Sequence, residues 1–201
     1  LEHPTTIIEK EGIKFGMAAF SPNFGTVSIH DILNAQRIIS ELKSEADIVI
    51  VSFHGGAEGA DHQNVTCETE FYYGENRGNV CRFAHSVIDA GADIVFGHGP
   101  HVTRSIDLYK DRFIAYSLGN FCTYARFNLR GENGIAPIIK VYTSSDGKFL
   151  KAQVTPIRQT GRGEPVIDKR NLAIRSLQRL LMEDFPDSQL MITNDGIIKR
   201  K

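Results

Sequence analysis

The sequence lacks the features that mark several protein classes. Lys and Arg number 23 against 24 Asp and Glu, and the formal net charge of −1 gives no basic footprint, so we expect no nucleic-acid partner. The three cysteines have no Cys-x-x-Cys spacing, which argues against a zinc ribbon. No apolar run reaches the about 18 residues of a transmembrane helix, and the amino terminus does not resemble a signal peptide. These absences leave an ordinary globular domain.

The length and the cysteines set two further limits. A chain of 201 residues can bury one sizeable core, with a smaller appendage at most. Because it opens with Leu1 rather than Met, we expect it to be a piece of a longer polypeptide. A single disulfide among Cys67, Cys81 and Cys122 is allowed, but its pairing does not follow from the sequence. A bridge between Cys67 and Cys81 would indicate an oxidising compartment.

Two apolar segments each end in histidine within a glycine-rich turn. Residues 46–54 and 92–101 both begin Ala-Asp-Ile-Val, continue as β-branched runs, and end at His54 and at the pair His98 and His101. A helical stripe at residues 80–88, closed by a glycine, lies between them, so the pattern predicts a right-handed βαβ unit with parallel strands. Ligands bind beyond the carboxyl ends of such strands, and we expect the three imidazoles to face one cleft.

The remaining periodicities predict hairpins and helices around this unit. We expect a last helix capped by Asp168 and stopped before Pro186, and an earlier one that begins in a capping box of Ser28 and Asp31. Residues 55–79 show no period, and we interpret them as a lid or substrate-facing insertion. Antiparallel hairpins are predicted at residues 5–20, 105–117 and 134–157.

The three strand-end histidines are the predicted metal ligands. Neutral imidazole is the commonest transition-metal ligand, and glycines beside it let the backbone approach an ion closely. A single histidine in such a place is more often a hydrogen-bonded structural residue, but convergence of His54, His98 and His101 on one crevice favours ligation. Three neutral imidazoles can hold one Zn²⁺ with an open position.

Other polar residues near these strands are candidates with two interpretations each. Glu58 can ligate a metal, orient a histidine or act as general base, or it can be a solvated loop carboxylate. Asn120 can donate a hydrogen bond to a phosphate or carboxylate oxygen of a substrate, or it can be a turn residue. Arg104, Arg126 and Arg130 can face an anionic substrate, or they can be ordinary surface arginines.

Four blocks in this order resemble the bacterial CapA, or poly-γ-glutamate (capsule) synthesis, family of the calcineurin-like metallophosphatase superfamily. The blocks are His54 with the following Gly55, Gly56 and Glu58; Ile-Asp-Ala-Gly-Ala-Asp at 88–93; Gly-His-Gly-Pro-His-Val at 97–102; and Ala-Tyr-Ser-Leu-Gly-Asn-Phe at 115–121. The resemblance implies an α/β fold, the C-terminal half of a metallophosphatase-like sandwich with a parallel βαβ core and additional antiparallel hairpins. Residues 1–160 would form this part and residues 161–201 a C-terminal helical extension.

The resemblance also carries metal-ligand roles to His54, His98 and His101, with two departures. The family usually has an aromatic residue where Gly55 stands and a histidine where Gly99 stands. The Asp-bearing and Asn-His blocks that supply the other ligands do not occur before His54, so we expect the amino-terminal half of the domain to lie outside this chain.

A metal-dependent hydrolase of phosphoesterase type in capsule or poly-γ-glutamate synthesis is therefore the first functional hypothesis. Its cofactor would be a divalent ion (Mn, Zn or Fe), and its substrate an anionic polymer or a phosphoester. The alternative is a non-catalytic polymer-binding or assembly component of an exopolymer export system. Either would work in the cell envelope of a bacterium, with capsule-synthesis membrane proteins as partners.

Overall fold

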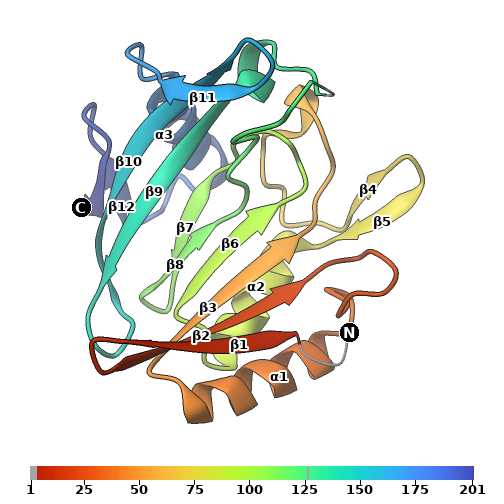
Figure 1. The fold of residues 1–201 in the computed structure, drawn as a ribbon, viewed down its shortest axis with the longest axis vertical. Coiled ribbons are helices and arrows are strands. Elements are labelled where there is room, and N and C mark those ends of the chain that lie inside the picture. The colour runs from red at the N-terminus through yellow and green to blue at the C-terminus, as the bar shows by residue number, and fades with distance from the viewer. Residues whose placement is uncertain (1–3, 126) are drawn as a thin grey trace.

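The computed structural model describes residues 4–125 and 127–201, and its larger sheet has a parallel centre. The strand order is β1-β2-β3-β6-β8-β7, in which the four middle strands are mutually parallel and the two edge strands pair antiparallel. The predicted α/β class, with a parallel βαβ core and added hairpins, is confirmed (Figure 1). The six strands are β1 (Thr5–Lys10), β2 (Ile13–Phe20), β3 (Ile48–His54), β6 (Ile94–His98), β7 (Ile106–Tyr109) and β8 (Arg112–Ala115).

Two helices cover one face of this sheet. α1 (Ile32–Glu45) and α2 (Val80–Asp89) bury their apolar stripes against the inward side chains of the parallel strands. The capping box expected at Ser28 is wrong, because α1 begins later. The side chain of Asp31 accepts a hydrogen bond from the backbone N–H of Asn34 at 3.1 Å, which satisfies a donor of the first turn that has no partner within the helix.

A second, antiparallel sheet packs against part of the first sheet. It consists of β9 (Ile135–Thr143), β10 (Phe149–Thr160), β11 (Glu164–Ile167), β12 (Leu190–Ile192) and β13 (Ile197–Arg200), with α3 (Leu172–Asp184) beside them. Its core with the first sheet includes the stacked rings of Phe113 and Phe149, whose centroids are 5.3 Å apart. Residues 161–201 thus contribute strands as well as a helix. The N-cap of α3 is Asn171 rather than the predicted Asp168, but the carboxylate of Asp168 does accept from the N–H of Leu172 at 3.1 Å.

The segment expected to have no regular structure, residues 55–79, contains a small hairpin. β4 (Glu70–Tyr72) and β5 (Glu75–Gly78) pair across Tyr73 and Gly74, which both have positive φ, as a two-residue hairpin turn requires. A disulfide between Cys67 and Cys81 joins this segment to α2. The insertion is therefore anchored covalently at one point.

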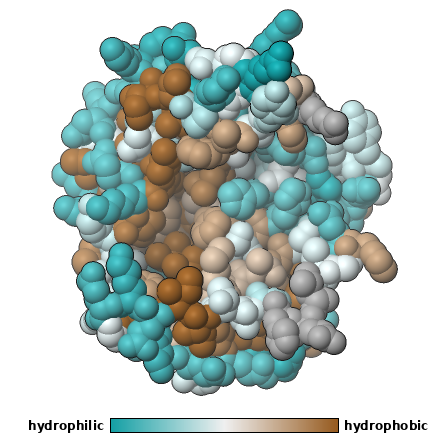
Figure 2. All heavy atoms as spheres, viewed as in Figure 1, coloured by the Kyte–Doolittle hydropathy of each residue, from teal (hydrophilic) through white to brown (hydrophobic). Residues whose placement is uncertain are grey.

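The second sheet covers only part of the first. Across the row Met17, Ile50, Ile94 and Phe113, the exposed fraction falls from 39% at Met17 to 2% at Phe113. Figure 2 shows apolar side chains in a hollow at the middle of this face, with a hydrophilic rim. Among the described residues, no helix has the length and apolar character needed to cross a bilayer.

Candidate functional site

The three predicted histidines line one cavity of about 700 Å³. His54 ends β3 and His98 ends β6, and the two are register partners in the parallel pairing of these strands. His101 follows in the turn after β6 with a φ of 59°. The opposite wall comes from β9, through residues that include Pro137 and Ile138. The expected convergence of the three imidazoles on one cleft is therefore observed.

Two glycines allow the strands to approach closely behind these histidines. A Cβ at Gly97 would lie 2.2 Å from the backbone oxygen of Tyr116 and 2.5 Å from Cζ of Phe53. Gly99 has a φ of 116°, and a Cβ there would lie 3.1 Å from Cδ2 of His54. A side chain at position 99 would therefore press against the imidazole of His54. Glycine at position 99 therefore lets the backbone pass close to Gly55 and His54.

Burial favours the neutral form of both strand-end histidines. Desolvation lowers the pKa of His54, and the nearby charges of Arg77, His101 and His98 lower it further. Desolvation likewise lowers the pKa of His98. Because a neutral imidazole keeps a lone pair for a metal, these shifts favour the ligating form at neutral pH.

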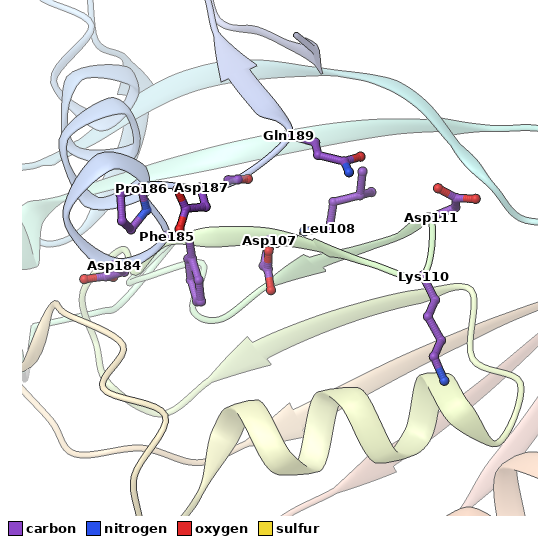
Figure 3. A pocket seen from close by; sticks show the side chains of 10 residues that line it. Asp107, Leu108, Lys110, Asp111, Asp184, Phe185, Pro186, Asp187 and Gln189 are labelled. Carbon is purple, nitrogen blue, oxygen red and sulfur yellow. Dashed lines mark hydrogen bonds between the residues drawn. The ribbon is translucent and has the colours of Figure 1, made fainter.

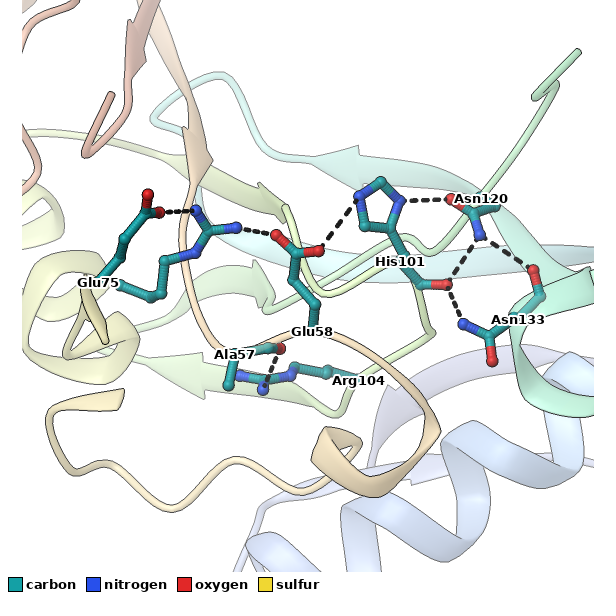
Figure 4. A network of polar contacts seen from close by, with 8 residues as sticks. Ala57, Glu58, Glu75, His101, Arg104, Asn120 and Asn133 are labelled. Atoms are coloured by element: carbon teal, nitrogen blue, oxygen red, sulfur yellow. Dashed lines mark hydrogen bonds and ion pairs between the residues drawn. The ribbon is translucent and has the colours of Figure 1, made fainter. Parts of the chain in front are cut away.

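Asn120 fixes the orientation and the tautomer of His101 (Figure 4). Its Nδ2 donates to the backbone oxygens of His101 at 3.0 Å and Asn133 at 3.1 Å, so its Oδ1 faces the ring, 2.7 Å from Nδ1 of His101. An amide oxygen only accepts, and Nδ1 must therefore carry the proton. In neutral His101 this arrangement leaves Nε2 with the free lone pair. The side-chain amide of Asn120 is thus already hydrogen-bonded within the protein. Its substrate-binding role stays a prediction.

Glu58 lies between a guanidinium and an imidazole rather than in solvent. One carboxylate oxygen is ion-paired with Arg77, and the other lies 4.0 Å from Nε2 of His101. Arg77 also contacts Glu75 at 3.1 Å, and its own side chain is buried. The network in Figure 4 therefore runs from Glu75 through Arg77 and Glu58 to His101. The catalytic role of Glu58 stays a prediction, and its position beside His101 is compatible with it.

Arg104 does not face a substrate, and that prediction is wrong. Its side chain is 1% exposed and makes a bidentate ion pair with Glu70 at 2.7 and 2.8 Å. It also donates to the backbone oxygens of His62 and Ala57 at 2.8 and 3.1 Å. Arg104 therefore holds the 55–79 segment beside the turn that carries His101. Arg130 is exposed, and Arg126 lies outside the described residues.

The donors at the cavity fit a divalent ion in kind but not in number. Neutral imidazoles suit Zn²⁺ or Fe²⁺, whereas Mn²⁺ prefers oxygen ligands, for which Glu58 is the nearby carboxylate. Within residues 4–125 and 127–201, no three or more His, Cys, Asp or Glu side chains are grouped closely enough to hold one ion. These residues form part of a ligand set, and no reaction step through a metal follows from them alone.

A separate cavity of about 530 Å³ is lined by four aspartates (Figure 3), and three of them have partners among the described residues. Asp111 pairs with Arg200 at 2.6 Å, and Asp107 lies 3.6 Å from Nε2 of His85. Asp184 accepts from the backbone N–H of Val65 at 3.0 Å. Because these three carboxylates already contact other residues, we do not interpret the cavity as a cation site.

Comparisons with known proteins agree with the site's sequence blocks. Residues 3–125 match the family described as bacterial capsule synthesis protein PGA_cap. The PGA biosynthesis protein CapA of Bacillus subtilis is 31% identical over 147 residues, which is 73% of this chain and 34% of that protein. The capsule biosynthesis protein CapA of Bacillus anthracis is 40% identical over 79 residues, or 39% of this chain and 16% of that protein. The chain thus spans about a third or less of the length of these relatives.

One solved structure is similar in fold. A crystal structure described as a novel phosphatase from Mycoplasma pneumoniae aligns with a TM-score of 0.52 at 15% identity, covering 84% of this chain and 59% of that one. This likeness confirms the metallophosphatase-like fold and says nothing of activity. The family match, the CapA relatives and the histidine cavity agree, and the chain belongs to the bacterial capsule synthesis (PGA_cap) family.

Proposed function

We propose that this chain is the histidine-bearing part of a metal-dependent hydrolase that acts in capsule or poly-γ-glutamate synthesis. The observation that carries the proposal is the single cavity lined by His54, His98 and His101 at the carboxyl ends of β3 and β6. Family membership supplies the capsule context, and the donor chemistry supports a metal.

Each side chain has a role that follows from its contacts. His54 and His98 present neutral rings from the ends of rigid strands, and Asn120 turns His101 so that Nε2 can ligate. A bound divalent ion would supply a water of lowered pKa and polarise the bond to be cleaved. Glu58, held beside His101 by Arg77, is placed to accept or return a proton. The remaining ligands would come from a part of the longer protein outside this chain.

The substrate proposed is a phosphoester or the amide backbone of an anionic polymer such as poly-γ-glutamate. A cell-envelope location is proposed with it. The disulfide between Cys67 and Cys81 supports that location, because such bridges persist in oxidising compartments. Capsule-synthesis membrane proteins are the proposed partners.

A non-catalytic polymer-binding or assembly component is the second candidate. The ion pair between Glu58 and Arg77 favours it, because it engages one oxygen of this carboxylate within the protein. Glycine in place of the family's usual histidine at position 99 favours it as well, because glycine supplies no side-chain ligand.

Metal content and turnover of the full-length protein separate the two. We expect bound divalent metal and hydrolysis of either a bis-aryl phosphate or poly-γ-glutamate, with both lost in His98→Ala. His85→Ala is the matched control, because His85 stacks on Tyr109 outside the cavity. Polymer binding without metal or turnover in the unaltered protein would contradict the hydrolase and support the binding component.

A further inference from the structure

A second cavity, of about 620 Å³, carries four arginines. It lies between the short helix η2 (Gly131–Gly134), β10 and α3, and one carboxylate, from Glu132, lines it as well. The arginines that line it are Arg158, Arg170, Arg175 and Arg179. Nothing in the proposed hydrolytic site uses these residues.

Two of the four arginines have no ion-pair partner among the residues that the structure describes. Arg179 pairs with Glu183 at 2.7 Å, and Arg170 lies 3.5 Å from Asp168. Arg158 and Arg175 make no ion pair and no side-chain hydrogen bond with any residue that the structure describes. In the aspartate-lined cavity, by contrast, three of the four carboxylates have a partner among the described residues.

The one carboxylate in the arginine cavity is itself engaged elsewhere. Glu132 accepts hydrogen bonds from Gln63 at 3.0 Å and from the hydroxyl of Ser176 at 2.8 Å. It makes no ion pair with a described arginine. The guanidinium groups of Arg158 and Arg175 are therefore left to bind an anion from outside.

The arginine cavity and the histidine cavity share a wall. Gln159 lines the arginine cavity, and its Nε2 donates to the backbone oxygen of Asn120 at 2.9 Å while its Oε1 accepts from the N–H of Thr123 at 2.9 Å. Asn120 and Thr123 both line the histidine cavity. The two cavities are therefore neighbours, connected through the contacts of Gln159.

We propose that the arginine cavity is a second binding site, which holds carboxylates of an anionic polymer whose neighbouring stretch lies in the histidine cavity. This rests on the proposed function for the nature of the ligand, but not for the site itself. Several guanidinium groups spread around one cavity suit a ligand with repeated carboxylates better than a single small anion, because each can bind a separate carboxylate in a bidentate pair. Binding in the arginine cavity would then position the neighbouring stretch of the polymer at the histidine cavity.

The test measures binding of a fluorescently labelled poly-γ-glutamate oligomer to the full-length protein, by anisotropy and with chelator present to suppress turnover. Arg175→Gln and Arg158→Gln should each weaken binding about tenfold, as expected for loss of a charge-assisted hydrogen bond. They should also reduce its dependence on salt. Arg82→Gln is the matched control, since Arg82 is an exposed helix arginine with no ion pair to any described residue. It should leave affinity within twofold.

Equal affinity of the Arg175→Gln, Arg82→Gln and unaltered proteins for the oligomer would overturn this site. Thermal melts check that Arg158→Gln is folded, and Arg175→Gln, on the exposed side of α3, decides the outcome if it is not. The hydrolase proposal fails separately, on metal content and on His98→Ala.

Discussion

The groups at the histidine cavity differ in what holds them in place. His54 and His98 are fixed by the register of β3 and β6, whose neighbouring residues Val51, Phe53 and Val95 are at most 1% exposed. His101 and Glu58 lie on loops and are held by individual polar contacts to Asn120 and Arg77. The strand-borne groups therefore depend on the whole core, whereas the loop-borne groups depend on single side chains. Substitutions in the polar contacts should displace His101 and Glu58 but leave His54 and His98 in place.

The largest effect is expected at the ion pair that anchors the 55–79 segment. Arg104→Met leaves Glu70 buried without its partner, which should lower the free energy of unfolding by about 3–5 kcal/mol. Urea titration of the full-length protein measures it. Arg37→Met removes an exposed pair with Glu41 and should cost about 0.5 kcal/mol or less. Equal costs for the two variants would show that the Arg104 pair is not what holds the segment.

The disulfide should have the next largest effect. Reduction of Cys67–Cys81, which are 14 residues apart, releases a loop whose closure is worth about 3 kcal/mol. Chemical unfolding with and without reductant measures the difference. Cys122→Ser should keep the full sensitivity to reductant, whereas Cys67→Ser should lose it. An unfolding free energy that is the same with and without reductant would argue against the disulfide.

Asn120 should affect metal affinity more than fold. Asn120→Ala removes the acceptor for Nδ1 of His101, and loss of such a contact typically lowers metal affinity about 10- to 100-fold. Asn120→Asp keeps an acceptor at that place and should restore most of the affinity. Competition with a chelator of known affinity measures both variants. The same loss in Asn120→Asp and Asn120→Ala would mean that the amide acts only in packing.

The smallest effect concerns the contact between the segment and α3. Burial raises the pKa of Asp184, so this carboxyl favours folding at pH values below its unfolded pKa and loses that contribution as pH rises through the folded value. Asp184→Asn, which can still accept from Val65, should therefore stabilise the protein slightly at pH 7. The gain should vanish below about pH 4, near the unfolded pKa of an Asp. Unfolding curves at pH 4 and 7 measure it, and a gain at both would contradict the assignment.

The same comparison explains what the sequence could predict. Strands buried on both faces give continuous apolar runs, so β3, β6 and the histidines at their ends were predictable. The ion pairs Arg104–Glu70 and Arg77–Glu58 join residues 34 and 19 positions apart. Their pairing depends on how a segment without period folds back, and no local pattern encodes it. The hairpin at Glu70–Gly78 was missed because its strands are only three and four residues long.

The central claim is that His54, His98 and His101 belong to one metal-binding site. Zn²⁺ titration of the full-length protein, followed by NMR of the imidazole ring nitrogens, tests it most directly. We predict that resonances of all three histidines change as metal binds, with Nδ1 of His101 protonated throughout, while those of His85 stay unchanged. Response of only one or two of the three, or a response of His85 in their place, would contradict the account.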